Sequence, residues 1–203
     1  MKKWFYPLGF VTLLGFGVLF LNFTRDEIIE LDHSMAKLLG DNAFITVFHY
    51  LGETTFIVIV TLLLLVYLWI RSKNYRGMLF VLFAVGVGNV LNQFLKKWVQ
   101  RERPDVPHQL ETFSFPSGHA MVGLLYVFTV AYFLTEYQSD KKIRILIWVS
   151  AVVLAGMIGL SRIAEHRHYA SDVFAGWMAG YTWFVLVALW YEYRKRSFHP
   201  NKS

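Results

Sequence analysis

A histidine followed four residues later by an aspartate is the strongest chemical signal in this sequence. If the segment is helical, His168 and Asp172 share a face and can touch. A carboxylate beside one ring nitrogen fixes the tautomer, stabilises positive charge on the ring and leaves the other nitrogen free to attack. Arg162 stands near the end of the preceding apolar segment, free to fold back. The plainer alternative makes Asp172 a simple N-cap.

The run Pro116-Ser117-Gly118-His119 stands directly before another apolar segment. Ser117 is a good N-cap, and Gly118 lets a ligand approach the first backbone amides closely. The free N–H groups and the positive dipole end of a helix make such a terminus a ready anion site. His119 would then lie in the first turn, where it can offer a proton to a departing oxygen. The alternative is an ordinary cap followed by an interfacial histidine.

A third segment holds Lys96 and Arg103, seven residues apart and therefore on one face if the helix continues. Pro104 favours an extended conformation at Arg103, so we expect the helix to end nearby. Taken alone, this segment is typical of basic side chains that anchor a helix end at a membrane interface.

Together the three segments offer what a phosphate monoester requires. Arginine binds two phosphate oxygens in a fork, and lysine neutralises the remaining charge. Phosphoryl transfer is mostly positioning and charge stabilisation, with one nucleophile and one acid added. Three converging cations would repel a divalent ion, and only one carboxylate is available to bind it. We therefore expect no metal and no cofactor.

The elements that carry these segments are apolar enough to span a membrane. Of the 203 residues, 56% are hydrophobic, whereas soluble domains are about 45–50% apolar. A spanning helix needs about 20 mostly apolar residues. The sequence predicts an all-α polytopic membrane protein, a bundle of six transmembrane helices in one domain over residues 1–203. The predicted spans are Trp4–Phe23, Thr54–Ile70, Gly77–Leu95, His119–Thr135, Ile145–Leu160 and Val173–Tyr191.

The basic residues orient this predicted bundle. Twelve of the 20 lie at the termini and in the loops 71–76 and 141–144. The positive-inside rule places both termini in the cytoplasm, with the first span as an uncleaved anchor. The three chemical segments then fall on the extracytoplasmic face of the cell membrane. Residues Asn22–Glu53 contain no full span, and we interpret them as an amphipathic piece at the outer interface or as an ordinary connecting loop.

Charge and cysteine content narrow the partners. The chain has no cysteine, which excludes disulfides and thiolate catalysis, and its formal net charge is +6. The basic residues form short clusters between apolar runs, which suit anionic lipid headgroups rather than nucleic acid. We expect a lipid bilayer and a membrane lipid phosphate as partners, with no nucleic acid and no obligate protein partner.

The three segments resemble the type 2 phosphatidic acid phosphatase family, also called the lipid phosphate phosphatase superfamily. The family pattern is Lys-x6-Arg-Pro, Pro-Ser-Gly-His and Ser-Arg-x5-His-x3-Asp. The chain matches every fixed position between Lys96 and Asp172. Small bacterial members with six spans look most similar, especially the phosphatidylglycerophosphate phosphatase B type.

The resemblance implies a role for each matched residue. His168 would attack phosphorus and form a phosphohistidine, with Asp172 orienting it, and His119 would protonate the leaving lipid oxygen. The residues that would hold the phosphate are Lys96, Arg103, Ser117, Gly118 and Arg162. The resemblance also implies a helical bundle and a metal-independent phosphatase. The expected substrate is phosphatidylglycerophosphate, and undecaprenyl pyrophosphate is the alternative.

Other interpretations remain open at this point. A vanadate-dependent haloperoxidase could use the same cations and histidines, but those relatives are typically soluble. An anion transporter tends to place ionisable groups near the bilayer midplane, and an inactive lipid-binding relative usually lacks a motif residue. His108, Glu165 and His166 are not motif positions; we interpret Glu165 and His108 as plain loop residues, with a role in tuning the pocket as the alternative. Gly86, Gly88, Gly176 and Gly180 favour close helix packing, and room for a lipid tail is the alternative.

Overall fold

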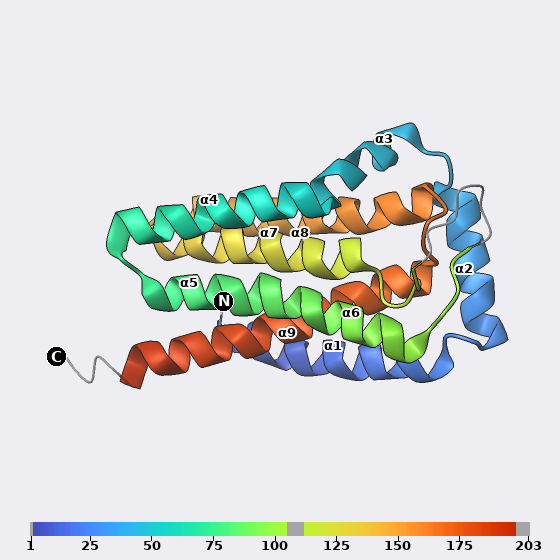
Figure 1. Ribbon diagram of the computed structural model, residues 1–203, viewed down its shortest axis with the longest axis horizontal. Coiled ribbons are helices and arrows are strands. Elements are labelled where there is room, and N and C mark those ends of the chain that lie inside the picture. Colours follow the sequence, from blue (N-terminus) through green and yellow to red (C-terminus); the bar gives the residue numbers. More distant parts are fainter. Residues whose placement is uncertain (1, 105–111, 198–203) are drawn as a thin grey trace.

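The computed structural model describes residues 2–104 and 112–197, and these form a bundle of helices without strands. Six helices are long and apolar enough to cross a membrane, as predicted (Figure 1). The third span joins three pieces into one rod, with the π-helical turn η2 in its middle. The spans are α1 (Lys2–Asn22), α4 (Thr54–Ser72), α5 (Tyr75–Val81) with η2 (Leu82–Val87) and α6 (Gly88–Val99), α7 (Gly118–Glu136), α8 (Lys141–Ala164) and α9 (Ala170–Ser197).

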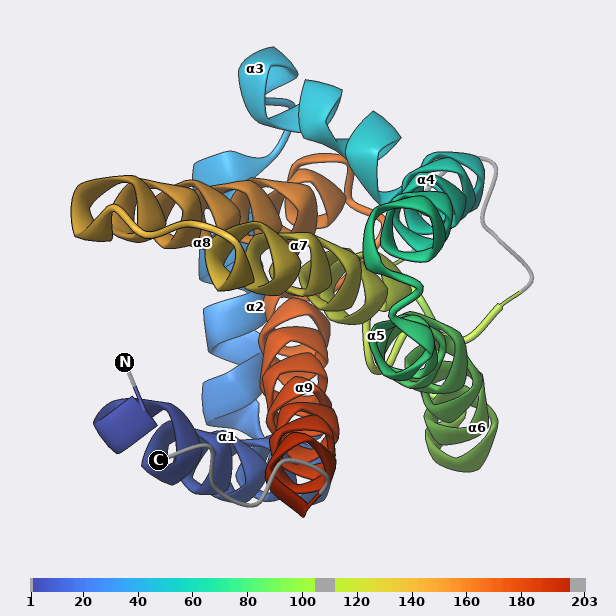
Figure 2. The same cartoon turned by 90° about the vertical axis from the view of Figure 1, so that its left-hand side faces the viewer.

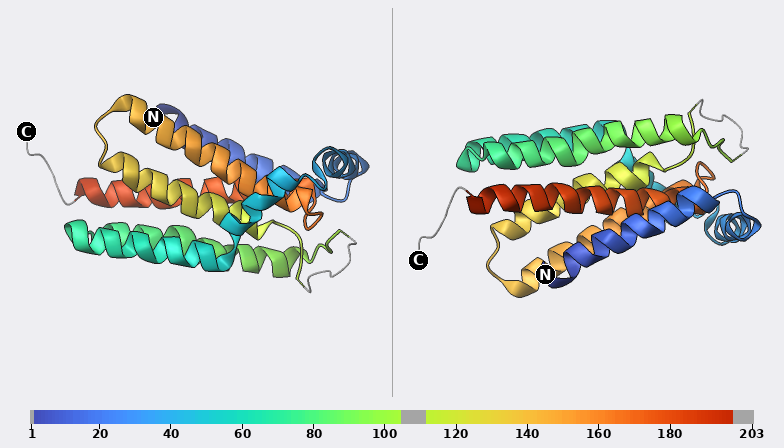
Figure 3. Two further views of the ribbon diagram at one scale, coloured as in Figure 1. Left: turned by 90° about the horizontal axis from the view of Figure 1, so that it is seen from above. Right: turned by 90° about the horizontal axis from the view of Figure 1, so that it is seen from below.

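The segment between the first two spans forms short helices at one end of the bundle. They are α2 (Asp26–Leu39), α3 (Ala43–Thr46) and the 3₁₀ helix η1 (Val47–Gly52). Helix α2 runs across this end, nearly perpendicular to the spans (Figures 1 and 3). Its Met35 and Leu39 pack on a buried cluster that includes Ile163 and Val173. The segment is therefore an amphipathic piece with its own contacts to the bundle, one of the two interpretations that the sequence left open.

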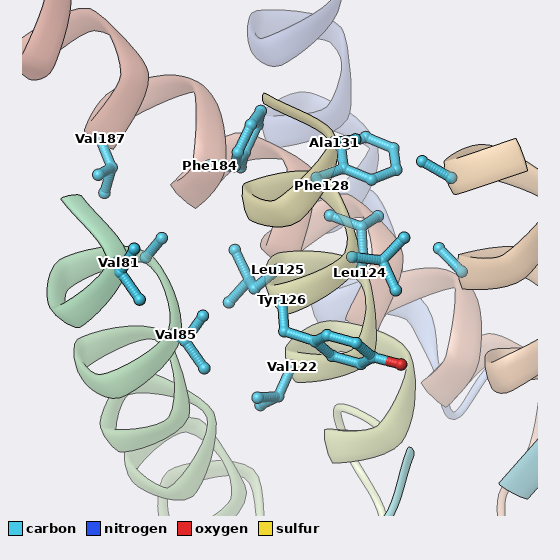
Figure 4. Close-up of a cluster of buried hydrophobic side chains, with 14 of the residues drawn as sticks. Val81, Val85, Val122, Leu124, Leu125, Tyr126, Phe128, Ala131, Phe184 and Val187 are labelled. Atoms are coloured by element: carbon cyan, nitrogen blue, oxygen red, sulfur yellow. The ribbon is translucent and has the colours of Figure 1, made fainter. Parts of the chain in front are cut away.

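Helix α7 forms the centre of the bundle, with the other spans around it (Figure 2). Most of its side chains are buried, among them Leu125 and Phe128, which pack with Val81 and Phe184 from neighbouring spans (Figure 4). Large apolar side chains on α1, α4 and α8 instead point outward. Lipid tails are as apolar as these side chains, so close packing rather than exclusion from water must hold such a core together.

Two glycines of the third span serve different purposes. A Cβ on Gly88 would lie 2.3 Å from Leu125 Cδ1, so this glycine allows close helix packing. A Cβ on Gly86 would meet nothing within 4 Å, and Gly86 lines a cavity. Gly176 and Gly180 also face neighbouring atoms at under 3 Å. Packing thus explains three of these glycines, and open space explains Gly86.

The third span ends before Arg103, so Lys96 and Arg103 do not share a helix face. Helix α6 stops at Val99, and Gln100 adopts a left-handed conformation with φ 54°. Lys96 lies in the last helical turn, and Arg103 lies in the extended segment before Pro104. The end of α6, the start of α7, the end of α8 and the start of α9 meet at the end of the bundle that α2 crosses (Figure 1).

Candidate active site

The predicted site residues meet at this end of the bundle. Six of the eight line one cavity of about 460 Å³: Lys96, Arg103, Gly118, His119, Arg162 and His168. The other two, Ser117 and Asp172, are fully buried. Segments that are separated by about 75 residues in the sequence thus converge on one place, as their chemistry predicted.

His168 and Asp172 form a buried pair. His168 Nδ1 lies 3.3 Å from Asp172 Oδ2, and neither side chain is more than 4% exposed. Helix α9 begins at Ala170, so His168 lies just before the helix rather than on its face. The backbone N–H of Tyr169 donates to the same Asp172 oxygen at 3.0 Å. The carboxylate is therefore fixed on the side that faces the ring.

Arg103 contacts the other nitrogen of this histidine. Its Nη1 lies 3.1 Å from His168 Nε2, and a guanidinium can only donate. His168 Nε2 must therefore carry a lone pair, and the ring proton must be on Nδ1, facing Asp172. Burial, together with the charges of Lys96, Arg103 and Arg162, lowers the pKa of His168 well below its ordinary value. The ring is neutral at pH 7 and presents Nε2 as a nucleophile.

Backbone carbonyl groups hold Arg103 and Lys96 in place. Arg103 donates through Nε to Thr112 O at 2.7 Å and through Nη1 to Arg167 O at 2.8 Å. Lys96 Nζ donates to Phe113 O at 2.6 Å. Burial and the nearby charge of Arg162 lower the pKa of Arg103 to about 10, so this side chain remains charged at neutral pH. Fixed, partly desolvated cations of this kind bind an anion strongly.

The start of α7 lies beside the cations, where the sequence predicts an anion site. Ser117 is the N-cap, its side chain accepts from Ala120 N at 3.4 Å, and its own N–H donates to Asp172 O at 3.0 Å. Gly118 is the first helical residue and lines the cavity. A Cβ at Gly118 would lie 3.1 Å from Asn92 Oδ1, so a larger residue would crowd the site. The helix terminus thus faces the same space as the cations.

His119 lies one residue further on, in the first turn of α7. Its Nε2 is buried and has no hydrogen-bond partner within residues 2–104 and 112–197. Glu53 is the nearest carboxylate, with Oε1 at 3.8 Å. Gly52 packs against the ring, because a Cβ there would lie 2.4 Å from His119 Cδ2. A buried histidine nitrogen that faces a cavity without a partner can exchange a proton with a bound molecule.

Arg162 faces the cavity from the end of α8. Its Nη1 pairs with Glu165 Oε2, and Glu165 Oε1 lies 2.9 Å from His49 Nδ1. Its Nε has no hydrogen-bond partner in the described part of the chain. Arg162 and Glu165 also line a second cavity of about 620 Å³. Glu165 is therefore more than a loop residue, whereas His108 lies outside the described residues.

The structure adds two residues that the sequence did not single out, Arg101 and Asp32. Arg101 Nη1 donates to Asp172 Oδ1 at 2.7 Å, and its Nη2 donates to Asp32 Oδ2 at 2.8 Å. Asp32 also accepts from the N–H and the hydroxyl of Ser171. The Arg101 guanidinium lies 4.1 Å from the ring centre of Tyr169. A buried network thus joins α2 to the carboxylate behind His168.

No cluster of three or more histidine, aspartate or glutamate side chains suited to a metal ion occurs in the part of the chain that the structure describes. What the site does hold is three cations, a helix N-terminus and two histidines around one cavity. This set can bind a phosphate, attack it and protonate its leaving group. Metal-independent turnover stays a prediction.

Comparisons with known proteins agree with this geometry. A family model described as the PAP2 superfamily matches residues 77–196. Phosphatidylglycerophosphatase B of Bacillus subtilis is 31% identical over 177 residues, covering 85% of this chain and 86% of that protein. Lipid phosphate phosphatase 2 of Arabidopsis thaliana is 26% identical over 151 residues, covering 58% of this chain and 52% of that protein.

A solved structure is similar over nearly the whole fold. It is the crystal structure of a transmembrane PAP2 type phosphatidylglycerolphosphate phosphatase from Bacillus subtilis. The match has a TM-score of 0.82 at 28% sequence identity and covers 93% of this chain and 98% of that chain.

Proposed function

This chain belongs to the PAP2 superfamily, and we propose that it removes the terminal phosphate of phosphatidylglycerophosphate at the extracytoplasmic face of the membrane. It is a multi-pass membrane protein and a lipid phosphatase. The substrate proposal is supported by the relative of 31% identity, which is a phosphatidylglycerophosphatase and aligns with 85% of this chain. Undecaprenyl pyrophosphate is the alternative substrate, since the same cations suit a pyrophosphate.

One observation supports a lipid substrate most directly. The cavity that holds the cations and histidines continues along α4 and the third span, between apolar side chains such as Leu62 and Leu82. A substrate can therefore place its phosphate among the cations while its tail remains beside the spans. The apolar lining along the spans suits acyl chains better than a water-soluble ester.

The first step transfers phosphorus to the histidine. Lys96, Arg103 and Arg162 hold the phosphate oxygens, and the α7 terminus at Ser117 and Gly118 adds N–H groups. Arg103 turns its Nη1 from His168 Nε2 to the phosphate, which frees the lone pair. That lone pair forms the N–P bond, the bond from phosphorus to the lipid oxygen breaks, and His119 gives a proton to this oxygen.

The second step releases phosphate. His119, now neutral, takes a proton from a water molecule, and the water oxygen attacks phosphorus. The N–P bond breaks, its electron pair returns to His168 Nε2, and inorganic phosphate leaves. Asp172 accepts from His168 Nδ1–H in both steps and stabilises the charge on the ring. The second cavity beside Arg162 offers water and phosphate a polar route.

The orientation in the membrane is part of the proposal. Helix α1 begins and α9 ends away from the end that carries the site (Figure 1). The excess of basic residues at those ends and in the loops on their side supports a cytoplasmic location for both termini. The site would then face outward. The chain has no cysteine of its own. Labelling of single cysteines introduced at Asp41 and at Lys141 with a membrane-impermeant thiol reagent therefore tests the orientation directly: Asp41→Cys should react from outside the cell, and Lys141→Cys should not.

The substrate is tested by measuring phosphate release from purified protein in detergent. Phosphatidylglycerophosphate, phosphatidate and undecaprenyl pyrophosphate are compared in parallel, with excess EDTA and a His168→Ala control. We expect release that survives EDTA, is lost in the variant and is fastest with phosphatidylglycerophosphate. A higher kcat/KM for undecaprenyl pyrophosphate than for phosphatidylglycerophosphate would show that the alternative substrate is the preferred one. Loss of activity in EDTA would contradict metal-independent turnover.

A further inference from the structure

The wall of the cavity changes its chemistry with depth. Along the third span it passes from Lys96 to Gln93 and Asn89, and then to the apolar Val85 and Leu82. A rise of 1.5 Å per residue places Gln93 about 4.5 Å and Asn89 about 10.5 Å from Lys96 along the helix axis. A neutral polar layer thus lies between the cations and the apolar depth of the cavity.

Helix α4 supplies a matching group on another part of the wall. Thr61 lies two turns beyond Thr54, the first residue of α4, and both line the cavity. Thr61 Oγ1 is buried and has no hydrogen-bond partner among the described residues. Threonine hydroxyls in helices commonly bond to a carbonyl of the preceding turn. Because Thr61 lines the cavity, a molecule bound there can supply the missing partner.

The amide of Asn89 is unusual for its position. It lies in the interior of the third span, its side chain is exposed, and it forms no hydrogen bond within the described residues. An amide without a hydrogen-bond partner is costly in an apolar medium. Polar side chains within a membrane normally face the bundle interior or a cavity that gives them a function. Asn89 lines the cavity, so a molecule bound there can supply its hydrogen-bond partner.

We propose that Asn89 and Thr61 bind the ester-bearing glycerol of a diacyl glycerophospholipid and so select this class of substrate over polyprenyl phosphates. The proposal rests on the phosphatase function proposed above and concerns the same site. In phosphatidylglycerophosphate the terminal phosphate is followed by a glycerol and a phosphodiester, then by the ester oxygens of the second glycerol, and finally by the acyl chains. The cavity wall likewise passes from cations through uncharged polar groups to apolar side chains.

A polyprenyl pyrophosphate does not match this order. Its last oxygen belongs to the pyrophosphate, and everything beyond that oxygen is hydrocarbon. Gln93, near Lys96, could still contact the pyrophosphate. Asn89 and Thr61 would face hydrocarbon and stay unpaired, which costs binding free energy. Asn89 and Thr61 thus disfavour the binding of polyprenyl pyrophosphates.

The test compares substrates in the double variant Asn89→Leu/Thr61→Val. Substrates are diacyl phosphatidylglycerophosphate, its dialkyl ether analogue without ester carbonyls, and undecaprenyl pyrophosphate. We expect the variant to lose about tenfold in the ratio of kcat/KM for the diacyl lipid to that for the polyprenyl lipid, the size of one or two hydrogen bonds. Wild type should prefer the diacyl lipid to its ether analogue, and the variant should lose this preference.

A matched control uses neighbouring residues that do not line the cavity. Val90→Leu/Leu63→Val changes the same two helices on exposed positions, and its substrate ratio should equal that of wild type. An unchanged ratio in Asn89→Leu/Thr61→Val overturns the inference, as does equal use of ester and ether lipids by wild type, which needs no variant. Failure of wild type to release phosphate from every lipid would instead contradict the proposed function itself.

Discussion

Arg101 donates to Asp172 at 2.7 Å, and the same guanidinium donates to Asp32 at 2.8 Å. One arginine thus joins the carboxylate that orients the proposed nucleophile to a helix that crosses the end of the bundle. Arg101 does not line the cavity. Its effect on the reaction must therefore pass through Asp172, which makes it a positioning residue.

The first prediction concerns this positioning. Arg101→Met should lower kcat by about 10- to 100-fold, the usual effect of losing a group that orients a reacting side chain. KM should change little, because the phosphate contacts remain. Arg101→Lys should restore part of kcat, and Asp32→Asn should show a smaller loss of the same kind. Steady-state kinetics of these variants would check this, with Arg25→Lys as control, because Arg25 is an exposed arginine at the start of α2. A raised KM at unchanged kcat in Arg101→Met would contradict the positioning role.

The second prediction concerns the Arg103 fork. Orthovanadate resembles the phosphate in transfer and should inhibit competitively. Arg103→Lys keeps the charge but loses the planar set of donors, so the inhibition constant for vanadate should rise roughly 10- to 100-fold. Arg71→Lys serves as the matched control, because Arg71 lies in the last turn of α4, at the end of that helix away from the site. Equal inhibition of Arg103→Lys and wild type would show that Arg103 does not hold the transferred group.

A third prediction separates the two histidines by leaving group. His119→Ala should lower lipid hydrolysis by about 10²- to 10⁴-fold, the range for a general acid. With 4-nitrophenyl phosphate, whose leaving group needs little protonation, the loss should be much smaller. His168→Ala should abolish the release of phosphate from both substrates. If the two substrates lose activity equally in His119→Ala, this histidine is not the acid.

The fourth prediction concerns pH and stability. An unfolded histidine has a pKa near 6.5, whereas burial and the charges of Lys96, Arg103 and Arg162 lower the pKa of His168 in the folded chain. Below pH 6.5 the unfolded state therefore binds a proton that the folded state does not. The contribution of His168 to stability is present above pH 6.5 and decreases as the pH falls, by about 1 kcal/mol between pH 6.5 and 5.5.

The measurement is the midpoint of thermal unfolding between pH 5 and 8 for wild type and His168→Gln. The midpoint of wild type should fall more steeply below pH 6.5 than that of the variant, and the two curves should run parallel above it. Parallel curves over the whole range would mean that His168 is protonated in the folded protein, contrary to its contact with Arg103.

Much of this architecture follows from local sequence. Six apolar runs predict six spans, and their ends differ from the observed ends by a few residues. Six of the eight residues chosen from the three motif segments line the cavity, because each segment stands at the end of an apolar run. Because these helices end on the same side of a membrane, the predicted topology alone places the motif residues close together.

The network behind the site could not be predicted in the same way. Asp32 is 69 residues from Arg101 and 139 from Ser171, and only the fold shows that α2 crosses this end of the bundle. Arg101 stands between Lys96 and Arg103, in a segment that, taken alone, is typical of interfacial anchoring. The end of α6 could not be predicted either. The left-handed conformation of Gln100 ends this helix, so Lys96 and Arg103 do not share the helix face on which a longer helix would place them.

In the proposed mechanism His168 Nε2 carries the phosphoryl group, and trapping this phosphohistidine tests the mechanism most directly. Protein mixed briefly with phosphatidylglycerophosphate labelled in its terminal phosphate is quenched in alkali, in which phosphohistidine survives, and digested for mass spectrometry. We expect label on His168 that alkali preserves and acid removes, with none in His168→Ala. Label on another residue, or turnover by wild type without a labelled enzyme at any time, would contradict it.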